Sequence, residues 1–177
     1  MAYAELKPIK FSGFLRKKRF FSETGIKDVL IKTGNVIAIN NTSENFKIWS
    51  RPKIQKAMLK NSATFLIISN RQLAFITFGM LKHGFNLKNV KIYSDFQKKL
   101  IDSAEFIPDN YRSFNLSDII SLFDTGIETN IAEVYLRKQK QEIIIKANGV
   151  IGFTNFSDQN KGEFLRYICE AYNESQT

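Results

Sequence analysis

The clearest hydrophobic pattern lies in the last third of the chain. In residues 131–138 (IAEVYLRK) apolar and polar side chains alternate, and residues 141–146 (QEIIIK) form a second run rich in β-branched residues. Both patterns are typical of β-strands. Asn148-Gly149 supplies two residues that accept positive φ, so a tight turn and a third strand over residues 150–156 are expected.

An amphipathic helix is expected after these strands. Ser157 is a good N-cap, and Asp158 falls in the first turn, where the helix dipole favours a carboxylate. The apolar positions that follow recur at helical spacing and form one stripe, made of Phe164, Leu165, Ile168, Cys169 and Tyr172. On this stripe Cys169 is expected to be a buried, unreactive thiol.

Residues 63–79 (ATFLIISNRQLAFITFG) contain two apolar runs separated by Ser69-Asn70-Arg71. Asn70 tolerates left-handed φ, so the pattern predicts a β-hairpin with a short turn at these polar residues. A buried helix is the competing interpretation. The β-branched and aromatic content, and the shortness of each run, favour the hairpin.

The remaining elements are less regular. Gly34-Asn35 between two β-rich runs predicts a further hairpin. Residues 114–123 (FNLSDIISLF) fit a helix and a bent strand equally well. The other expected elements are the strands of that hairpin over 28–33 and 36–40, one or two helical turns over 53–60, a strand over 89–93, a short helix over 95–104 capped by Ser94, and a loop over 108–110.

Together these elements predict an α+β fold that is mainly antiparallel β. Short, closely spaced strands favour a bent sheet or a partly open barrel, and the C-terminal amphipathic helix can cover one end or one face of it. No linker or internal repeat divides the 177 residues, so one domain is expected over residues 1–177.

Residues 68–75 (ISNRQLAF) resemble a hairpin motif of the pleckstrin-homology-like superfold, most closely of its bacterial and GRAM-type branches. That motif has the form T-N-x-R-L between two apolar strands. Asn70 and Leu73 fit it, Ser69 replaces the Thr, and Arg71 comes one place early. The resemblance implies a binding module instead of an enzyme.

The resemblance extends over about residues 60–173. Residues 114–120 (FNLSDII) are loosely similar to an I-P-hydrophobic-x-x-I segment of the family, without the Pro, and residues 131–173 follow the family's order of strands and a closing helix. It implies a core over 61–173 with an insertion at 80–113, preceded by basic N-terminal strands and a loop over 1–60.

The net positive charge of the chain lies entirely in residues 1–71. Residues 1–71 hold 14 Lys/Arg and 4 Asp/Glu, whereas residues 72–177 hold 12 Lys/Arg and 13 Asp/Glu. Such asymmetry suggests an anionic partner, although a merely solvated basic surface is the simpler interpretation. Residues 13–21 (GFLRKKRFF) also resemble two basic pieces of eukaryotic pleckstrin-homology domains, G-x-L-x-K and K-x-R-F-F, joined without the loop between them.

We therefore expect a non-catalytic module that docks on an anionic membrane surface or a phosphorylated headgroup. The candidate anion-binding residues are Arg16, Lys17, Lys18, Arg19, Lys27 and Lys32, and the candidate membrane-contact aromatics are Phe14, Phe20 and Phe21. If residues 16–19 form a strand, two of the four cations lie on each face. The first alternative is a protein–protein adaptor or assembly subunit, and the second is a nucleic-acid-binding protein. The expected partner is an anionic lipid or an acidic protein surface.

Catalytic and metal chemistry has little support in the sequence. One His, His83, and one Cys do not make a metal site of several Cys and His, and no P-loop, G-x-S-x-G or dinucleotide motif occurs. Nothing in the spacing singles out the carboxylates Asp118 and Asp124. No cofactor is implied. The absence of a secretory leader, of a transmembrane run and of paired cysteines predicts a cytoplasmic protein, peripheral at a membrane.

Overall fold

The computed structural model describes residues 3–27, 29, 31–33, 35–94, 99–102, 107–124 and 129–174. Its strands are β1 (Tyr3–Phe11), β2 (Ile31–Thr33), β3 (Val36–Asn40), β4 (Ala63–Phe65), β5 (Asn86–Ser94), β6 (Lys99–Asp102), β7 (Thr129–Lys138), β8 (Gln141–Lys146) and β9 (Ile151–Thr154). In the described chain they form one antiparallel sheet in the order β2-β3-β1-β9-β8-β7-β5-β6, and β4 pairs with β1.

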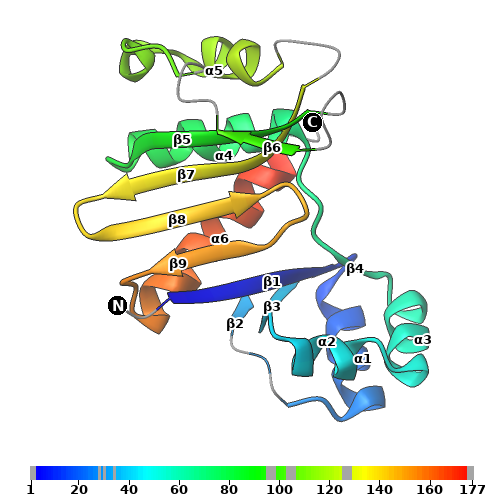
Figure 1. Ribbon diagram of the computed structural model, residues 1–177. Helices are drawn as coiled ribbons and strands as arrows, with labels where there is room; N and C mark the ends of the chain where they lie inside the picture. Colours follow the sequence, from blue (N-terminus) through cyan, green and yellow to red (C-terminus); the bar gives the residue numbers. More distant parts are fainter. Residues whose placement is uncertain are drawn as a thin grey trace.

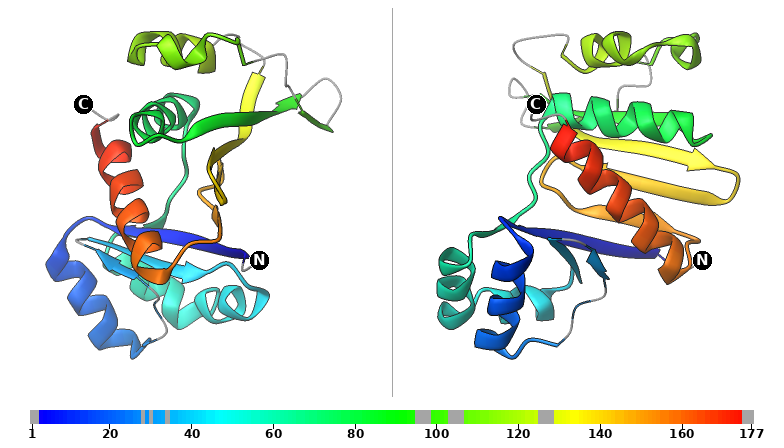
Figure 2. Two further views of the ribbon diagram at one scale, coloured as in Figure 1. Left: turned by 90° about the vertical axis from the view of Figure 1, so that its left-hand side faces the viewer. Right: turned by 180° about the vertical axis from the view of Figure 1, so that it is seen from behind.

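Helices lie in two groups. Helices α4 (Asn70–Lys82) and α6 (Asp158–Glu174) cover one face of the β5–β9 part of the sheet, and α5 (Leu116–Phe123) lies on α4 (Figures 1 and 2). Helices α1 (Phe14–Thr24), α2 (Ser43–Trp49) and α3 (Pro52–Lys60) gather at the opposite end of the molecule. A short 3-10 helix, η2 (Tyr111–Ser113), precedes α5. No described helix covers the face of the β5–β9 sheet that Figure 1 presents.

The sheet bends where β1 passes from one group of helices to the other. Residues Tyr3–Leu6 of β1 pair with β9, whereas Ile9–Phe11 pair with β4 and Leu6–Lys10 pair with β3 along the other edge. In Figure 2 the β1–β3 part consequently lies across the β7–β9 part. The expected α+β fold, with a bent, open antiparallel sheet and a C-terminal helix, is confirmed.

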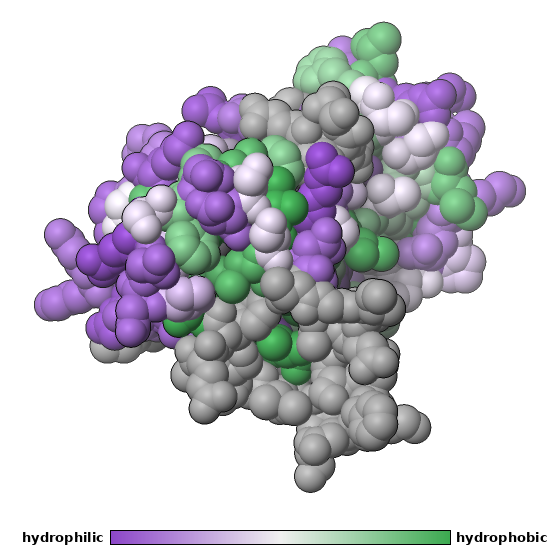
Figure 3. Space-filling view, turned by 90° about the horizontal axis from the view of Figure 1, so that it is seen from above, coloured by the Kyte–Doolittle hydropathy of each residue, from purple (hydrophilic) through white to green (hydrophobic). Residues whose placement is uncertain are grey.

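Two hydrophobic cores follow from this bend. The larger core lies between the β5–β9 sheet and helices α4, α5 and α6, and includes Leu73, Ile76, Met80, Val90, Ile119, Phe123, Val134, Ile143, Ile145, Phe153, Leu165 and Ile168. The smaller core, here called the lower core, lies between β1, β3, β4 and helices α1–α3, and consists of Ile9, Phe11, Phe20, Ile37, Ile39, Trp49, Ile54, Ala57, Met58 and Ala63. On the surface of the molecule seen from the α5 end, hydrophobic residues lie between hydrophilic ones (Figure 3).

The hairpin predicted over residues 63–79 is wrong. Only its first part is a strand, β4, and residues from Asn70 onward form helix α4. Ser69 Oγ accepts a hydrogen bond from the backbone N–H of Gln72, whose side-chain Oε1 accepts one from Ser69 N–H at 2.8 Å. This capping box begins a helix because it satisfies backbone donors that a helix start leaves without partners.

Two further predictions are decided by hydrogen bonding. Within residues 114–123 the helix forms from Leu116 onward, because Asn115 and Asp118 form a second capping box at the start of α5. The short helix expected over 95–104 is wrong at residues 99–102, which form β6 and pair with β5; residues 95–98, 103 and 104 lie outside the described residues. The segment expected as an insertion, 80–113, supplies strands β5 and β6 to the sheet.

The other predicted elements are confirmed. Helix α3, strand β5, the strands β7–β9 and the helix α6 lie where the pattern placed them. Of the hairpin expected over 28–40, β3 and residues 31–33 of the first strand form and pair as β2–β3, whereas residues 28, 30 and 34 lie outside the described residues. Ser157 Oγ accepts a hydrogen bond from Asn160 N–H, as an N-cap does. On α6, Leu165, Ile168 and Cys169 are buried, so the apolar stripe packs against the larger core.

Candidate functional site

The predicted basic cluster lies on helix α1 and not on a strand. A helix turns about 100° per residue, so Arg16, Lys17, Lys18 and Arg19 point in successive directions around α1 instead of alternating between two faces. Arg16, Lys18 and Arg19 are exposed, but Lys17 is buried, with Nζ 5.2 Å from the centroid of the Phe14 ring. The strand interpretation of this segment is therefore wrong.

The three predicted aromatics differ in exposure. Phe14 is 62% exposed at the start of α1, and Phe21 is partly buried. Phe20 is fully buried in the lower core, where its ring stacks on Trp49 at a centroid distance of 5.6 Å and lies 5.3 Å from Phe11. Phe20 is thus a core residue, and its predicted contact with a membrane surface is not available in this fold.

Glu23 connects α1 with the end of α3. Its carboxylate is 3.0 Å from Arg19 Nε and 2.7 Å from Lys60 Nζ, and it accepts a hydrogen bond from Asn61 Nδ2 at 3.2 Å. The hydrogen bond from Lys60, with that from Arg19, lowers the pKa of Glu23 against a smaller opposing effect of burial. Arg16 Nη1 also donates to Ser62 Oγ, so both ends of α1 are attached to the region that follows α3.

Helix α3 adds a second row of cations beside α1. It packs through Ile54, Ala57 and Met58, and its Lys53, Lys56 and Lys60 are exposed. We call the exposed side chains of these two helices the basic helical surface: Arg16, Lys18, Arg19, Lys53, Lys56 and Lys60, with the apolar residues Phe14, Leu15 and Leu59 among them. Figures 1 and 2 show α1 and α3 side by side.

The contribution of α3 to this surface was not predicted from the sequence. The i, i+3, i+7 spacing of Lys53, Lys56 and Lys60 is the signal that could have found it, because such positions share one side of a helix. Of the other predicted residues, Lys27 is exposed just after α1, and Lys32 lies on β2. Neither belongs to the basic helical surface.

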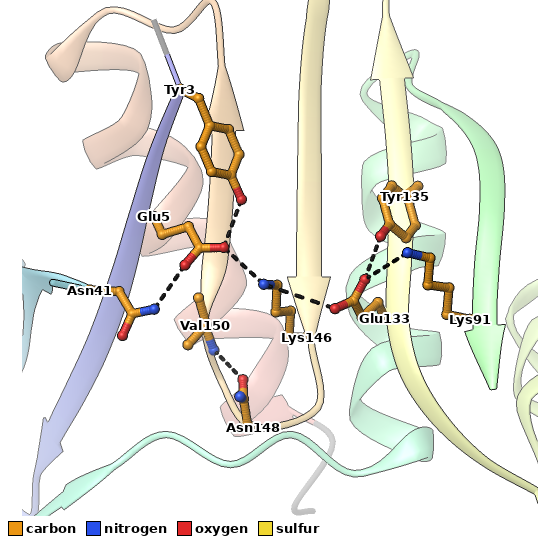
Figure 4. A network of polar contacts seen from close by, with 9 residues as sticks. All are labelled: Tyr3, Glu5, Asn41, Lys91, Glu133, Tyr135, Lys146, Asn148 and Val150. Carbon is orange, nitrogen blue, oxygen red and sulfur yellow. Dashed lines mark hydrogen bonds and ion pairs between the residues drawn. The ribbon is translucent and has the colours of Figure 1, made fainter. Parts of the chain in front are cut away.

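A second group of charges lies on the uncovered face of the sheet (Figure 4). Lys146 Nζ on β8 is 2.8 Å from Glu5 Oε1 on β1 and 3.9 Å from Glu133 Oε1 on β7. Lys91 Nζ on β5 is 3.7 Å from Glu133 Oε2, and the Tyr135 hydroxyl donates to the same carboxylate. Two glutamates and two lysines, on strands β1, β8, β7 and β5, thus alternate across the sheet and balance one another.

The Glu5 carboxylate in this network is surrounded by side-chain hydrogen-bond donors. It accepts hydrogen bonds from Lys146, from the Tyr3 hydroxyl at 2.7 Å and from Asn41 Nδ2 at 2.8 Å. Burial alone would raise the pKa of Glu5, but these donors outweigh burial and lower the pKa to about 2. Gly152 leaves room for the Tyr3 ring, because a Cβ there would lie 2.7 Å from the Tyr3 hydroxyl oxygen.

Groups capable of nucleophilic or metal chemistry do not converge here. Burial raises the pKa of the Cys169 thiol to about 12, which suppresses the reactive thiolate. His83 is exposed at the end of α4, with its ring edge-to-face with Tyr167 at 5.0 Å. In the described part of the chain, no three His, Cys, Asp or Glu side chains come together as metal ligands would.

Comparisons with known proteins do not identify the chain. The hairpin on which the resemblance to the pleckstrin-homology-like superfold depended is helix α4. Among the described helices, none combines the length and the apolar character needed to cross a membrane. No family model, no curated protein and no solved structure matches this sequence.

Proposed function

We propose that this protein is a binding module that docks on an anionic membrane surface through the basic helical surface. The observation that supports it is the combination, on two adjacent helices, of exposed cations with exposed large apolar side chains. Leu15 is 78% exposed and Leu59 is 80% exposed, whereas monomeric proteins normally bury most residues of this kind. Membrane-bound amphipathic surfaces combine the same two features.

The charge distribution supports the same function. Residues 14–60, which include helices α1–α3, hold 11 Lys/Arg and 3 Asp/Glu. Each Lys or Arg near an anionic leaflet contributes about 1 kcal/mol, so six exposed cations are sufficient for membrane association even if Glu23 offsets part of their attraction. Insertion of Phe14, Leu15 or Leu59 into the interface would add an apolar contribution that salt does not screen.

Membership of the pleckstrin-homology-like superfold stays a prediction. A bent antiparallel sheet that ends in a helix supports a distant relation to the pleckstrin-homology-like superfold. Helix α4 in place of the motif hairpin argues against it. On the proposed function the protein is peripheral, on the cytoplasmic side of a membrane.

Co-sedimentation with vesicles tests the proposal. The protein is mixed with neutral or phosphatidylserine-containing vesicles at low and physiological salt, with and without duplex DNA as a competitor. We expect selective pelleting with the anionic vesicles that survives DNA. If the protein does not pellet with anionic vesicles even at low salt, the membrane function is rejected and an acidic protein partner is favoured. If the protein binds the competitor DNA instead of the vesicles, the nucleic-acid alternative is favoured.

Matched variants locate the surface. The triple variant Arg16→Glu, Lys18→Glu, Lys56→Glu is expected to weaken vesicle binding on the order of 100-fold, because three contributions of about 1 kcal/mol each are lost. The control reverses three exposed cations elsewhere, Lys88, Arg112 and Lys140, and so changes net charge equally. Equal weakening by both triple variants would show that net charge matters and the basic helical surface does not.

A further inference from the structure

A cavity of about 710 Å³ opens beside β1 at the bend of the sheet. This volume lies within the range of small-molecule sites, which are mostly apolar with a few placed polar groups. Its lining combines side chains from β1, α2, β4, the segment after β4 and the turn before β9, chiefly Lys7, Phe46, Trp49, Phe65, Ile67 and Val150. The cavity is separate from the exposed side chains of α1 and α3.

The polar end of the cavity is Lys7. It follows Tyr3 and Glu5 on the same face of β1, but unlike the lysines of the charge network it is not paired with an acid: among the described residues, no carboxylate lies within 4.0 Å of Lys7 Nζ. Lys7 Nζ donates to the Asn148 carbonyl and lies 5.7 Å from the centroid of the Phe65 ring.

A half-buried ammonium without a counter-charge is costly, and burial accordingly lowers the pKa of Lys7. The nearest acid along the strand, Glu5, does not compensate it, because Lys146, Tyr3 and Asn41 already occupy that carboxylate. An ammonium has three donors, and the Asn148 carbonyl uses one of them. An anionic group at this position would therefore gain a charge-assisted hydrogen bond and restore the charge balance.

The mouth of the cavity is apolar. Two lining residues, Phe46 on α2 and Ile67 in the segment that follows β4, are 68% and 70% exposed. Trp49, fully buried, lies in the wall between them and the lower core. An apolar chain that extends from Lys7 toward the mouth would cover these side chains from water.

We propose that this cavity binds a single-chain amphiphile with an anionic head group, with the head on Lys7 and the apolar chain along Phe65, Ile67 and Trp49. The chemical class is a long-chain carboxylate or alkyl phosphate. The observations that lead to this class are the unpaired cation at one end, the apolar walls and the two exposed apolar side chains at the mouth.

Trp49 is the only tryptophan of the chain, so its fluorescence reports on the cavity directly. The protein is titrated, below the micelle concentration and without vesicles, with dodecanoate, dodecyl phosphate and the neutral dodecanol, and binding is confirmed by calorimetry. We expect both anions to bind at least 10-fold more tightly than dodecanol. The anion that binds more tightly shows whether the site prefers a free carboxylate or a phosphorylated headgroup.

Variants separate the head-group contact from the apolar contact. Lys7→Met should remove the preference for the anions and leave dodecanol binding unchanged, and Lys7→Arg should restore part of the preference. Ile67→Asp, at an exposed position, should weaken all three ligands. The control Lys10→Met changes a lysine whose Nζ lies over Tyr172 on the other face of β1, and should change nothing.

Three results would overturn the proposal: no binding of any amphiphile, equal binding of dodecanoate and dodecanol, or unchanged anion binding by Lys7→Met. Complete absence of binding would point to an apolar peptide of a partner as the occupant. Because no vesicle is present, failure here leaves the membrane function untouched, and failure of vesicle binding leaves this cavity untouched.

Discussion

Gly149→Ala tests how the segment after β4 is held against the sheet. Gly149 has φ +81°, and a Cβ on it would lie 1.8 Å from the carbonyl oxygen of Leu66, whereas Cβ contacts under 3.0 Å are essentially never seen. The segment cannot retreat without loss, because Leu66 N–H donates to the Pro8 carbonyl at 3.0 Å and Ile68 N–H donates to the Ala147 carbonyl at 2.8 Å.

The cost of this substitution has two parts. Left-handed φ costs an alanine about 1–2 kcal/mol relative to glycine. Displacement of the Leu66 carbonyl disturbs two backbone hydrogen bonds, each with a net contribution of about 0.5–1.5 kcal/mol. The free energy of unfolding should fall by about 2–5 kcal/mol in total, and a loss of 3 kcal/mol corresponds to a melting temperature about 6–12 °C lower for a chain of this size.

Gly25→Ala is the matched control. Gly25 has φ +69°, but nothing lies within 4 Å of its added Cβ, so only the backbone part of the cost applies. Urea unfolding followed by circular dichroism measures both variants. If Gly149→Ala is no more destabilising than Gly25→Ala, the close approach of Leu66 to the turn does not exist in solution and the cavity wall described above is misplaced.

Three further predictions concern stability and reactivity. Glu5 has a pKa of about 2 in the folded protein, against 4.5 for the ordinary group. Its carboxylate therefore stabilises the fold fully above about pH 5 and by less as the pH falls toward 2. Glu5→Gln should lower the free energy of unfolding by at most about 3 kcal/mol at pH 7 and make urea unfolding less dependent on pH in this range. Ser69→Ala should cost about 1 kcal/mol in urea unfolding through loss of the α4 capping box, whereas Ser69→Asp keeps the acceptor. Cys169 should react with a thiol reagent only after unfolding, and rapid labelling of the native protein would contradict its burial.

The C-terminal third of the fold could be predicted because local and tertiary signals agree there. Alternation along 131–138, the Asn148-Gly149 turn and the Ser157 cap each specify the element that forms. In residues 63–79 the signals conflict. β-Branched and aromatic residues favour strands, but propensity is a weak preference that tertiary packing overrides. Here the capping box and burial of Leu73, Ile76 and Met80 at helical spacing outweigh it.

The candidate sites differ in how far the sequence reveals them. The concentration of cations before residue 71 was visible, but their grouping on two helices depended on a correct assignment of α1, whose Phe-rich, basic sequence resembled a strand. The cavity was not predictable. It requires Lys7 and Asn148, which are 141 positions apart and meet only because β1 pairs with β9. The local periodicity of a sequence does not show which distant strands pair.

Strand β1 explains why these features occur together. One of its faces presents Tyr3 and Glu5 to the polar network, then Lys7 to the cavity, then Ile9 and Phe11 to the lower core, so polarity decreases steadily along a single strand. The cavity therefore lies where the charged sheet face gives way to the apolar core beneath α1–α3. Trp49 lines the cavity and stacks on Phe20 of α1, which means that the core supporting the basic helical surface also forms a cavity wall. Substitutions within this core would perturb both sites at once, and only surface substitutions such as Lys18→Glu and Ile67→Asp can separate the two functions.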